Sequence, residues 1–183
     1  METTKTEIID KAAEIIMNSG IQNLTIHKLA TNLDVDKNLL YTMITKDDDI
    51  LLLLLLDFEA ELEEFVWAMN QNTEQPETEL RILFKKLYFF FLQKPHYLAI
   101  IFDKHLKERN RSIKEALLRI KEITEKYLTG IIERGKRENT FNTSEPTQKL
   151  VERLLADFRI FMGNEQRLHE MILEMKQLKQ LKD

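Results

Sequence analysis

The chain contains no cysteine, and this absence excludes several kinds of chemistry at once. Without a thiol there is no disulfide framework, no thiolate zinc site, no cysteine nucleophile and no thiol redox sensor. A chain without cysteine suits a reducing compartment, and we expect the protein to work in the cytoplasm.

Glycine and proline are also scarce, at four and three of 183 residues. Hairpin turns depend on these two residue types, whereas the abundant Leu, Glu and Lys favour helices. Apolar residues make up 43% of the chain and charged residues 32%, which is ordinary for a folded protein. The composition therefore predicts an all-α fold.

Long hydrophobic runs are absent as well. The longest, Ile50 to Leu56, has seven residues and is bounded by Asp47 and Asp57. A membrane-spanning helix needs roughly 20 apolar residues. The first ten residues, METTKTEIID, lack the basic and then apolar order of a signal peptide. We expect no membrane partner, and we interpret the run at residue 50 as part of a core helix.

Positive charge is limited in the N-terminal part of the chain. The net charge is −4, and residues 1–46 hold five Lys against six acidic residues. A DNA-binding protein normally neutralises several phosphates with Lys and Arg. The electrostatic contribution of this segment to DNA affinity would therefore be small unless Lys28, Lys37 and Lys46 converge on one face.

Residues 24–50 carry the pattern of two short helices joined by a tight turn. Thr25 can cap a first helix, residues 33–35 make the turn, and Asp36 can cap a second helix that ends near Met43. Thr4 and Glu7 form a possible capping box for a preceding helix. Together these signals predict a three-helix, helix-turn-helix domain whose last helix would enter the DNA major groove.

Apolar residues at helical spacing predict further helices along the rest of the chain. The expected helices, about nine in all, span about 5–18, 26–32, 37–43, 46–70, 76–91, 95–107, 112–137, 146–162 and 164–181. Thr45 and Asp48 loosely repeat the capping pattern before the fourth helix.

In the predicted helix-turn-helix domain, and at two positions much later, the chain resembles the TetR family of bacterial transcriptional regulators. The matching positions are Ala12-Ala13, Gly20, Thr25, Leu29-Ala30, Val35 and Leu40-Tyr41, followed much later by Gly135 and Phe141. The resemblance implies a helix-turn-helix DNA-binding domain in residues 1–46. It also implies a helical effector-binding and dimerisation domain in residues 47–183.

Four positions depart from that family pattern. The family usually has Gly where this chain has Asp34, Ser where it has Asp36 and Phe where it has Ile44. It also has a phosphate-binding Lys where this chain has Asp47; the lysine of this chain, Lys46, lies one position earlier. A carboxylate repels a phosphodiester, so the acidic residues 47–49 would stabilise the helix dipole while spoiling an anion site there.

The resemblance and the helix geometry together predict which residues form a DNA-binding surface. Lys37, Asn38 and Thr42 would project outward, and Lys37 and Asn38 can read purine edges. By resemblance, Tyr41 would hydrogen-bond a backbone phosphate. The predicted DNA-binding residues are Thr25, Lys28, Lys37, Asn38, Tyr41, Thr42 and Lys46. The alternative is a solvated helix with a partly buried Tyr.

Aromatic residues gather on three successive expected helices. A helical bundle of this kind can enclose an apolar pocket with a few polar groups, and the resemblance implies a small apolar effector there. The predicted ligand-binding residues are Trp67, Phe84, Tyr88, Phe91, His96, Tyr97, Phe102 and His105. The alternative is that these side chains are simply core.

The last two expected helices carry apolar stripes. In the family that the chain resembles, such helices pair with those of a second copy, which suits a palindromic operator with two half-sites. The predicted dimer-interface residues are Leu150, Leu154, Phe158, Phe161, Leu168, Met171, Met175 and Leu178. Packing within one chain is the alternative.

Nothing in the sequence favours an enzyme, a cofactor or a metal site. The four histidines, at positions 27, 96, 105 and 169, are scattered, and neither an HExxH motif nor a glycine-rich phosphate loop occurs. We expect an effector-controlled DNA-binding regulator, more often a repressor in the family it resembles. Two alternatives remain: a dimer of the same fold that has lost specific DNA binding, and a helical-bundle enzyme with buried acidic residues.

Overall fold

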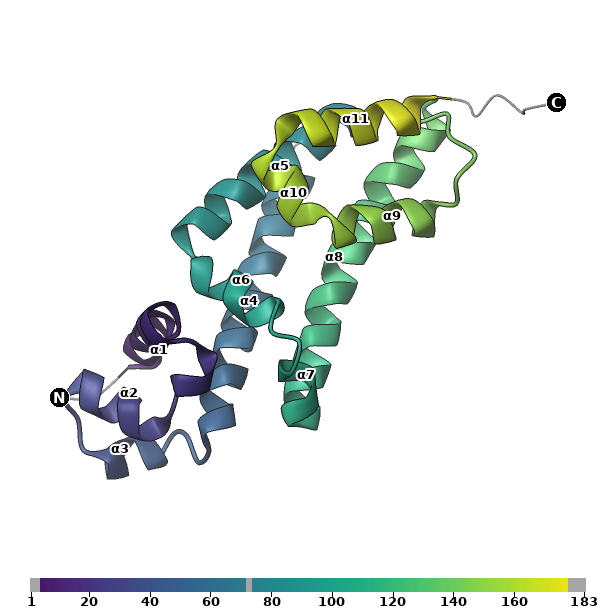
Figure 1. Cartoon of the computed structure of the whole chain (residues 1–183). Coiled ribbons are helices and arrows are strands. Elements are labelled where there is room, and N and C mark those ends of the chain that lie inside the picture. Colours follow the sequence, from purple (N-terminus) through teal and green to yellow (C-terminus); the bar gives the residue numbers. More distant parts are fainter. Residues whose placement is uncertain (1–3, 72–73, 178–183) are drawn as a thin grey trace. The chain divides into compact units, whose positions relative to one another are not determined.

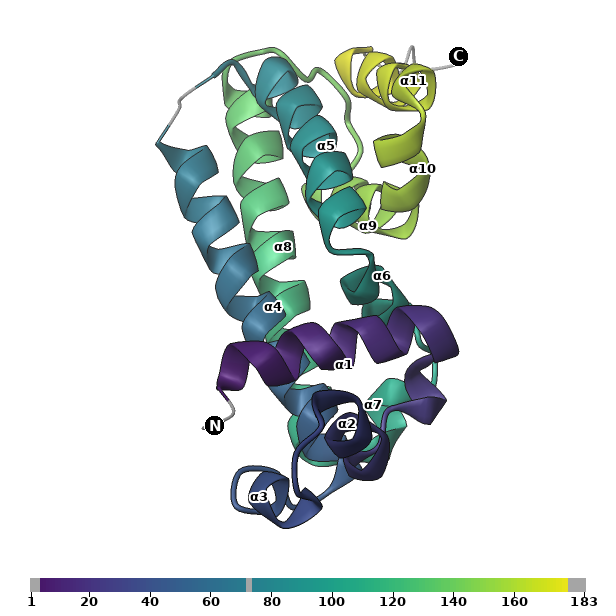
Figure 2. The same ribbon diagram turned by 90° about the vertical axis from the view of Figure 1, so that its left-hand side faces the viewer.

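The computed structural model describes residues 4–71 and 74–177, and within these ranges it is helical with no β-strand (Figures 1 and 2). The elements are α1 (Lys5–Ser19), η1 (Ile21–Asn23), α2 (Ile26–Leu33), α3 (Lys37–Tyr41), α4 (Asp47–Asn70), α5 (Pro76–Gln93), α6 (Pro95–Ile101), α7 (Leu106–Arg109), α8 (Arg111–Arg137), α9 (Thr147–Ala156), α10 (Phe158–Gly163) and α11 (Glu165–Lys176). The all-α prediction is confirmed.

The number of helices differs from the expected nine, because the described residues form eleven α-helices. The expected helix at 95–107 is divided into α6 and α7, where the Asp103 carboxylate accepts the backbone N–H of His105 at 2.9 Å. Such local side-chain bonds compete with helix formation. The expected helix at 146–162 is divided at Asp157, whose φ of −106° and ψ of 12° are not helical.

Contacts divide the chain into two compact units, and each unit consists of two segments that are separate in the sequence. The first unit comprises the chain up to residue 63 together with residues 91–120, and the second comprises 64–90 and the chain from 121 onward. The first unit thus contains more than the helix-turn-helix segment. The functional boundary at residue 46 stays a prediction.

In the first unit, α1, α2 and α3 lie together around the first turns of α4 (Figures 1 and 2). The predicted capping box opens α1: the Thr4 hydroxyl accepts the Glu7 N–H at 3.2 Å, and the Glu7 carboxylate accepts the Thr4 N–H at 2.8 Å. The side chains of Ile8, Leu29 and Leu40 are fully buried. Their burial joins α1, α2 and α3 into one small core.

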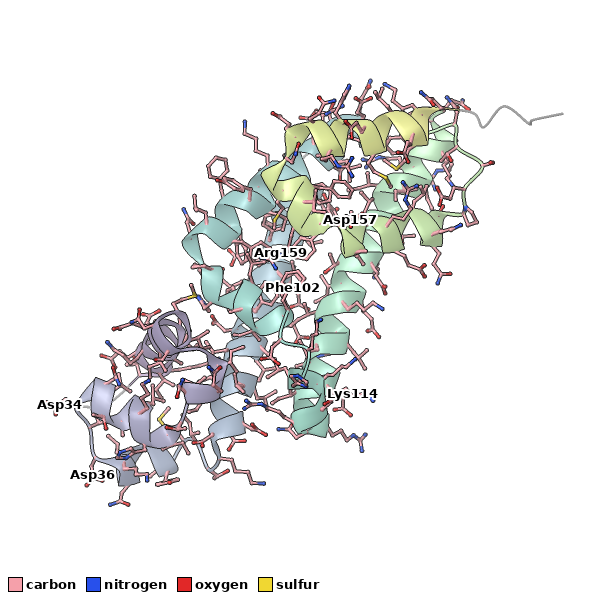
Figure 3. The ribbon with its side chains drawn as sticks, viewed as in Figure 1. Asp34, Asp36, Phe102, Lys114, Asp157 and Arg159 are labelled. Carbon is pink, nitrogen blue, oxygen red and sulfur yellow. The ribbon has the colours of Figure 1, made fainter. Side chains whose placement is uncertain are left out.

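The turn between α2 and α3 has a left-handed residue at its start. Asp34 has φ 53° and ψ 43°, and it is the residue that ends α2. Figure 3 labels Asp34 together with Asp36, the residue that caps α3. The N–H of Val35 then returns to the carbonyl oxygen of Ala30 at 3.2 Å. This closed turn directs the chain into α3.

The second unit has its own core, formed by α5, the later part of α8 and the helices α9 to α11. Leu80, Ile132, Leu154 and Ile172 are fully buried there. Glu79 is also buried, and it accepts the Tyr127 hydroxyl at 2.8 Å and the guanidinium of Arg134. The buried carboxylate is therefore paired and hydrogen-bonded, as burial of a charge requires.

Gly135, near the end of α8, lies directly against the buried ring of Phe141. A methyl group at Gly135 would overlap that ring, whereas one at Gly130 in the same helix would meet nothing. We expect Gly135→Ala to lower the free energy of unfolding by about 1–3 kcal/mol through overpacking. Gly130→Ala should raise it by up to about 1 kcal/mol through helix propensity. Urea denaturation of both variants tests this, and equal effects would contradict it.

Asp34 generates a second stability prediction, because L residues other than Asn and Asp rarely adopt its left-handed conformation. We expect Asp34→Gly to raise the free energy of unfolding by about 0.5–1 kcal/mol, since glycine has no β-carbon to strain. Asp34→Ala keeps the β-carbon and serves as the matched control. Thermal denaturation should show a higher Tm for the glycine variant only; a similar gain for alanine would rule out backbone strain as the cause.

Candidate functional site

The helix-turn-helix segment is built from helices whose first amides are satisfied by nearby side chains. The Thr25 hydroxyl accepts the Lys28 N–H at 3.1 Å at the start of α2. The Asp36 carboxylate accepts the Asn38 N–H at 2.8 Å at the start of α3. Both predicted caps are present, and they fix where each helix begins. The second helix ends at Tyr41, two residues earlier than expected.

The outer face of α3 gathers four of the predicted DNA-binding residues, all of them exposed. The Lys37 ammonium lies 5.7 Å from the centroid of the Tyr41 ring, which is within cation–π range. The Thr42 hydroxyl donates to the Leu39 carbonyl oxygen at 2.7 Å, and the Asn38 side chain is exposed. On the inner face, Leu40 is fully buried and anchors the helix.

The three lysines considered from the sequence differ in their surroundings. The Lys28 ammonium donates to the Ser19 hydroxyl at 2.7 Å and is thereby held at the end of α1. Lys37 and Lys46 are exposed. The backbone N–H of Lys46 donates to the Asp49 carboxylate at 2.9 Å. Lys37 is therefore the exposed cation on α3, whereas Lys28 is engaged within the protein.

The three acidic residues that open α4 each have a different partner. Asp47 accepts the first N–H of α2, that of Ile26, at 2.7 Å. Asp48 accepts from the Arg109 guanidinium at 3.2 Å and from the Asn110 side-chain amide at 3.0 Å. Asp47 thus places a carboxylate at the N-terminus of α2, where an anion would otherwise be favoured.

Asp49, which the sequence interpretation passed over in favour of Asp48, binds the residues that immediately precede α4. Its carboxylate accepts the backbone N–H of Thr45 at 2.9 Å and the Thr45 hydroxyl at 2.7 Å. These bonds, with the Thr45 hydroxyl first, hold the pKa of Asp49 below its usual value. The spacing Thr45-x-x-x-Asp49 is one residue longer than a capping box, which is why the pattern was missed.

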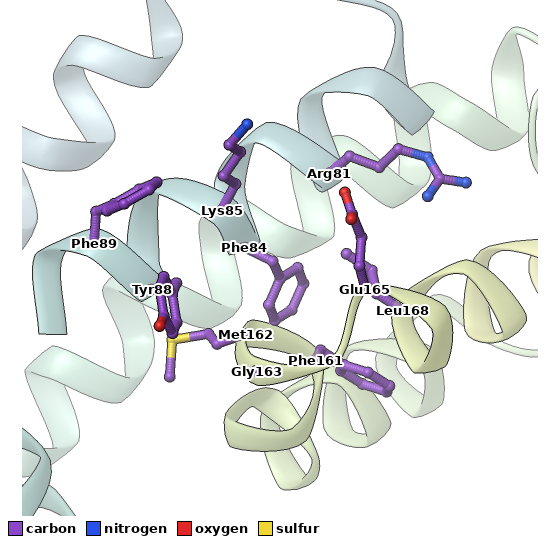
Figure 4. Close-up of a pocket in the computed structure, with 10 residues that line it drawn as sticks. All are labelled: Arg81, Phe84, Lys85, Tyr88, Phe89, Phe161, Met162, Gly163, Glu165 and Leu168. Carbon is purple, nitrogen blue, oxygen red and sulfur yellow. The ribbon is translucent and has the colours of Figure 1, made fainter. Parts of the chain in front are cut away.

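The second unit contains an open groove of about 320 Å³ between α5 and the α10–α11 segment (Figure 4). The rings of Phe84 and Phe161 meet edge to face at its base, with centroids 5.7 Å apart. Arg81 on its rim is held by Glu77 at 3.0 Å and by the His169 ring nitrogen at 2.8 Å. The groove is lined by Arg81, Phe84, Lys85, Tyr88, Phe89, Phe161, Met162, Gly163, Glu165 and Leu168.

The predicted ligand-binding residues are divided between the two units. Phe84 and Tyr88 line the groove, whereas Trp67, in the same unit, is 65% exposed and lies outside it. The other five belong to the first unit: Phe91, His96, Tyr97, Phe102 and His105. There, the Tyr97 hydroxyl donates to Asp57 at 2.5 Å and its ring stacks on Phe58, so Tyr97 has a core role.

The predicted dimer-interface residues are placed mainly inside the chain. In the second unit, the side chains of Leu150, Leu154, Phe161, Leu168, Met171 and Met175 are buried in the core, and Phe158 packs partly buried against it. This is the intramolecular packing that the sequence left open. Leu178 lies outside the described residues. The large apolar side chains exposed on α10 and α11 are instead Ile160 and Leu173.

Within the described ranges, no helix is both long enough and apolar enough to cross a membrane. Groups of three or more His, Asp or Glu that could hold a metal ion are likewise absent from those residues.

Comparison with known proteins links these features to a group of regulators. No protein-family model matches the chain. The chain is 27% identical over 135 residues to the fatty acid metabolism regulator protein of Bacillus subtilis (strain 168), and the match covers 70% of this chain and 66% of that protein. The match thus spans slightly less than two thirds of the relative's length.

Solved structures resemble the chain over almost its whole length. The transcriptional regulator FadR from Bacillus subtilis, in complex with stearoyl-CoA, has a TM-score of 0.72 at 17% identity, with 94% of this chain and 97% of that one covered. A bacterial regulatory protein of the tetR family from Rhodococcus RHA1 has a TM-score of 0.76 at 14% identity, with 94% and 98% covered. The chain therefore has the fold of the TetR-family transcriptional regulators.

Proposed function

We propose that this protein is a transcriptional repressor rather than an enzyme, and that it binds a palindromic DNA operator as a cytoplasmic homodimer. A small effector with an apolar chain would release it from the DNA. The observation that carries the proposal is the first unit's helix-turn-helix: two capped helices joined by the left-handed turn at Asp34, with a polar outer face on the second.

The outer face of α3 supports major-groove binding. Lys37 and Asn38 can donate to guanine or contact adenine edges, and the Tyr41 hydroxyl can donate to a phosphate. Leu40 on the opposite face is fully buried, so α3 has a fixed rotational setting. A helix held in this way presents the same side chains to DNA each time it docks.

A homodimer would place two such helices about 34 Å apart, on successive turns of the operator. The buried apolar stripes of α9 and α11 pack within the chain, so the proposed interface uses other side chains. Ile160 on α10 and Leu173 on α11 are 48% and 40% exposed and are suited to burial against a second copy.

The groove of the second unit supports an effector with an apolar chain. Phe84, Phe161 and Leu168 give it an apolar base, and Tyr88 and Phe89 offer exposed aromatic surface beside it. The regulators similar in sequence and fold include proteins named for fatty acid metabolism, one of them solved with stearoyl-CoA. We therefore take long-chain acyl thioesters as the first effectors to test.

The proposed control is a shift between two populations. In one conformation of the dimer the two α3 helices are spaced for the operator, and in the other they are not. An effector lowers operator affinity only by as much as its own affinity for the second conformation exceeds its affinity for the first. Tight binding to both conformations would change nothing.

The second candidate function is a dimer of the same fold that no longer binds specific DNA. Asp47 favours it, because its carboxylate occupies the first amide of α2 and would repel a phosphate approaching there. In this case the second unit would act as a ligand-binding or protein-interaction module.

The proposed function is tested by incubating the full chain with fragmented DNA of its own genome at low and moderate salt, then sequencing what it retains. We expect enrichment of a short palindrome. On that sequence, Lys37→Ala and Tyr41→Phe should each weaken binding about five- to tenfold.

Lys114→Ala is the matched control, since Lys114 is an exposed lysine on α8, away from α3 (Figure 3), and should leave affinity unchanged. No palindrome at either salt, from a folded protein, would overturn the repressor and favour the second candidate.

The effector site is tested without DNA by titrating the protein with stearoyl-CoA in a calorimeter. Tyr88→Ala should weaken binding about tenfold or more, because aromatic side chains bury large apolar areas. Trp67→Ala is the matched control: it also removes an exposed aromatic from the second unit, but one that does not line the groove. Equal losses in both variants would place the ligand elsewhere.

A further inference from the structure

His96, on α6 in the first unit, carries an unusual buried group. The residue is 9% exposed, and within the described residues Nε2 is the buried side-chain nitrogen or oxygen that has no hydrogen-bond partner. Buried polar atoms are nearly always hydrogen-bonded, and those that are not call for an explanation. Neither the proposed DNA surface nor the groove uses this residue.

His96 lies on α6, a helix that packs against the support of the helix-turn-helix. α6 packs against α1, which in turn packs against α2. The His96 ring contacts the ring of Tyr97, with centroids 4.1 Å apart. The Tyr97 hydroxyl is itself fixed to Asp57 on α4. A change at His96 therefore acts where α1, α4 and α6 meet.

Four charged groups face His96 from the elements around it. Asp10 on α1 and the α4 residues Asp57 and Glu61 are acidic and favour the protonated ring. Lys94, immediately before α6, disfavours it, and Lys94 is also ion-paired with Glu61. Burial has the largest effect, followed by Lys94, and together they hold the pKa of His96 below its usual value.

We propose that His96 is a proton-sensitive contact, and that its protonation loosens the packing of α6 against α1. At neutral pH the ring is uncharged and can remain buried without a partner for Nε2. A second proton creates both a buried charge and a buried N–H donor with no acceptor, which strongly disfavours the packed arrangement.

The direction of the pH dependence follows from linkage. Because the pKa of His96 is lower in the packed state than in water, the loosened state binds more protons, and acid favours it. The stabilising effect of the neutral ring is complete above about pH 6.5, the ordinary histidine value, and is lost as the pH falls through the lowered pKa.

The first measurement is an NMR titration of the ring protons of the four histidines in the full chain. We expect His96 to titrate below the ordinary histidine value of about 6.5. Backbone amides of α1 should shift with the His96 titration. A His96 that titrates at or above that value, or α1 amides that do not follow it, would overturn the proposal. The wild-type chain suffices, so a variant that fails to fold does not affect this result.

Hydrogen exchange then measures the contact itself. Protection of α1 and α6 amides, corrected for the intrinsic rate, should fall between pH 7.5 and acid pH. The limiting loss is about tenfold for each pH unit by which the His96 pKa lies below the ordinary histidine value. His96→Leu should abolish this pH dependence, and His105→Leu should preserve it. Equal pH dependence in both variants would contradict the role of His96.

A consequence for DNA rests on the proposed function: operator affinity should decrease in acid in the wild type more than in His96→Leu. The NMR and exchange experiments contain no DNA, so their outcome is independent of whether an operator exists. If the contact responds to protons but the protein does not bind DNA, the proposed repressor function is refuted and this inference stands. If the protein binds DNA but the contact does not depend on pH, this inference is refuted and the repressor function stands.

Discussion

The helix-turn-helix depends on one constraint: the first amides of each of its helices need hydrogen-bond acceptors, and the chain supplies them from its own side chains. Thr4 serves α1, Thr25 serves α2 and Asp36 serves α3. Asp47, from the start of α4, adds a bond to α2 across 21 residues of sequence. This longer bond ties α4 to the helix-turn-helix segment as well as satisfying an amide.

The same constraint places several carboxylates at helix N-termini in this part of the chain. Carboxylates at helix N-termini interact favourably with the helix dipole, so Asp36, Asp47 and Asp49 stabilise the fold. They also reduce the positive potential that DNA binding requires, since non-specific affinity comes mainly from phosphate neutralisation. The chain thus combines a firmly capped helix-turn-helix with little local positive charge, and under the proposed function the specific DNA contacts would come from α3.

Sequence reasoning performed best where the relevant interaction is local. The capping box at Thr4 and the caps at Thr25 and Asp36 were all predicted, because each involves residues two or three positions apart. The division of the expected 95–107 helix was missed, because the bond from His105 to Asp103 competes with a helix that the periodicity equally allows. The wider spacing at Asp49 was missed for a similar reason.

By itself, the sequence determined the helical class, most helix positions and the exposed polar face of α3, since these follow from propensity, capping and periodicity. Only the tertiary structure decided which apolar stripes face inward. Leu154 and Met175, which were predicted for an interface, are fully buried in their own chain, while Ile160 and Leu173, which were not, are exposed. It also separated Tyr88, beside a groove, from Tyr97, in the core of the other unit. The physical reason is that periodicity identifies an apolar face but does not specify the surface that covers it.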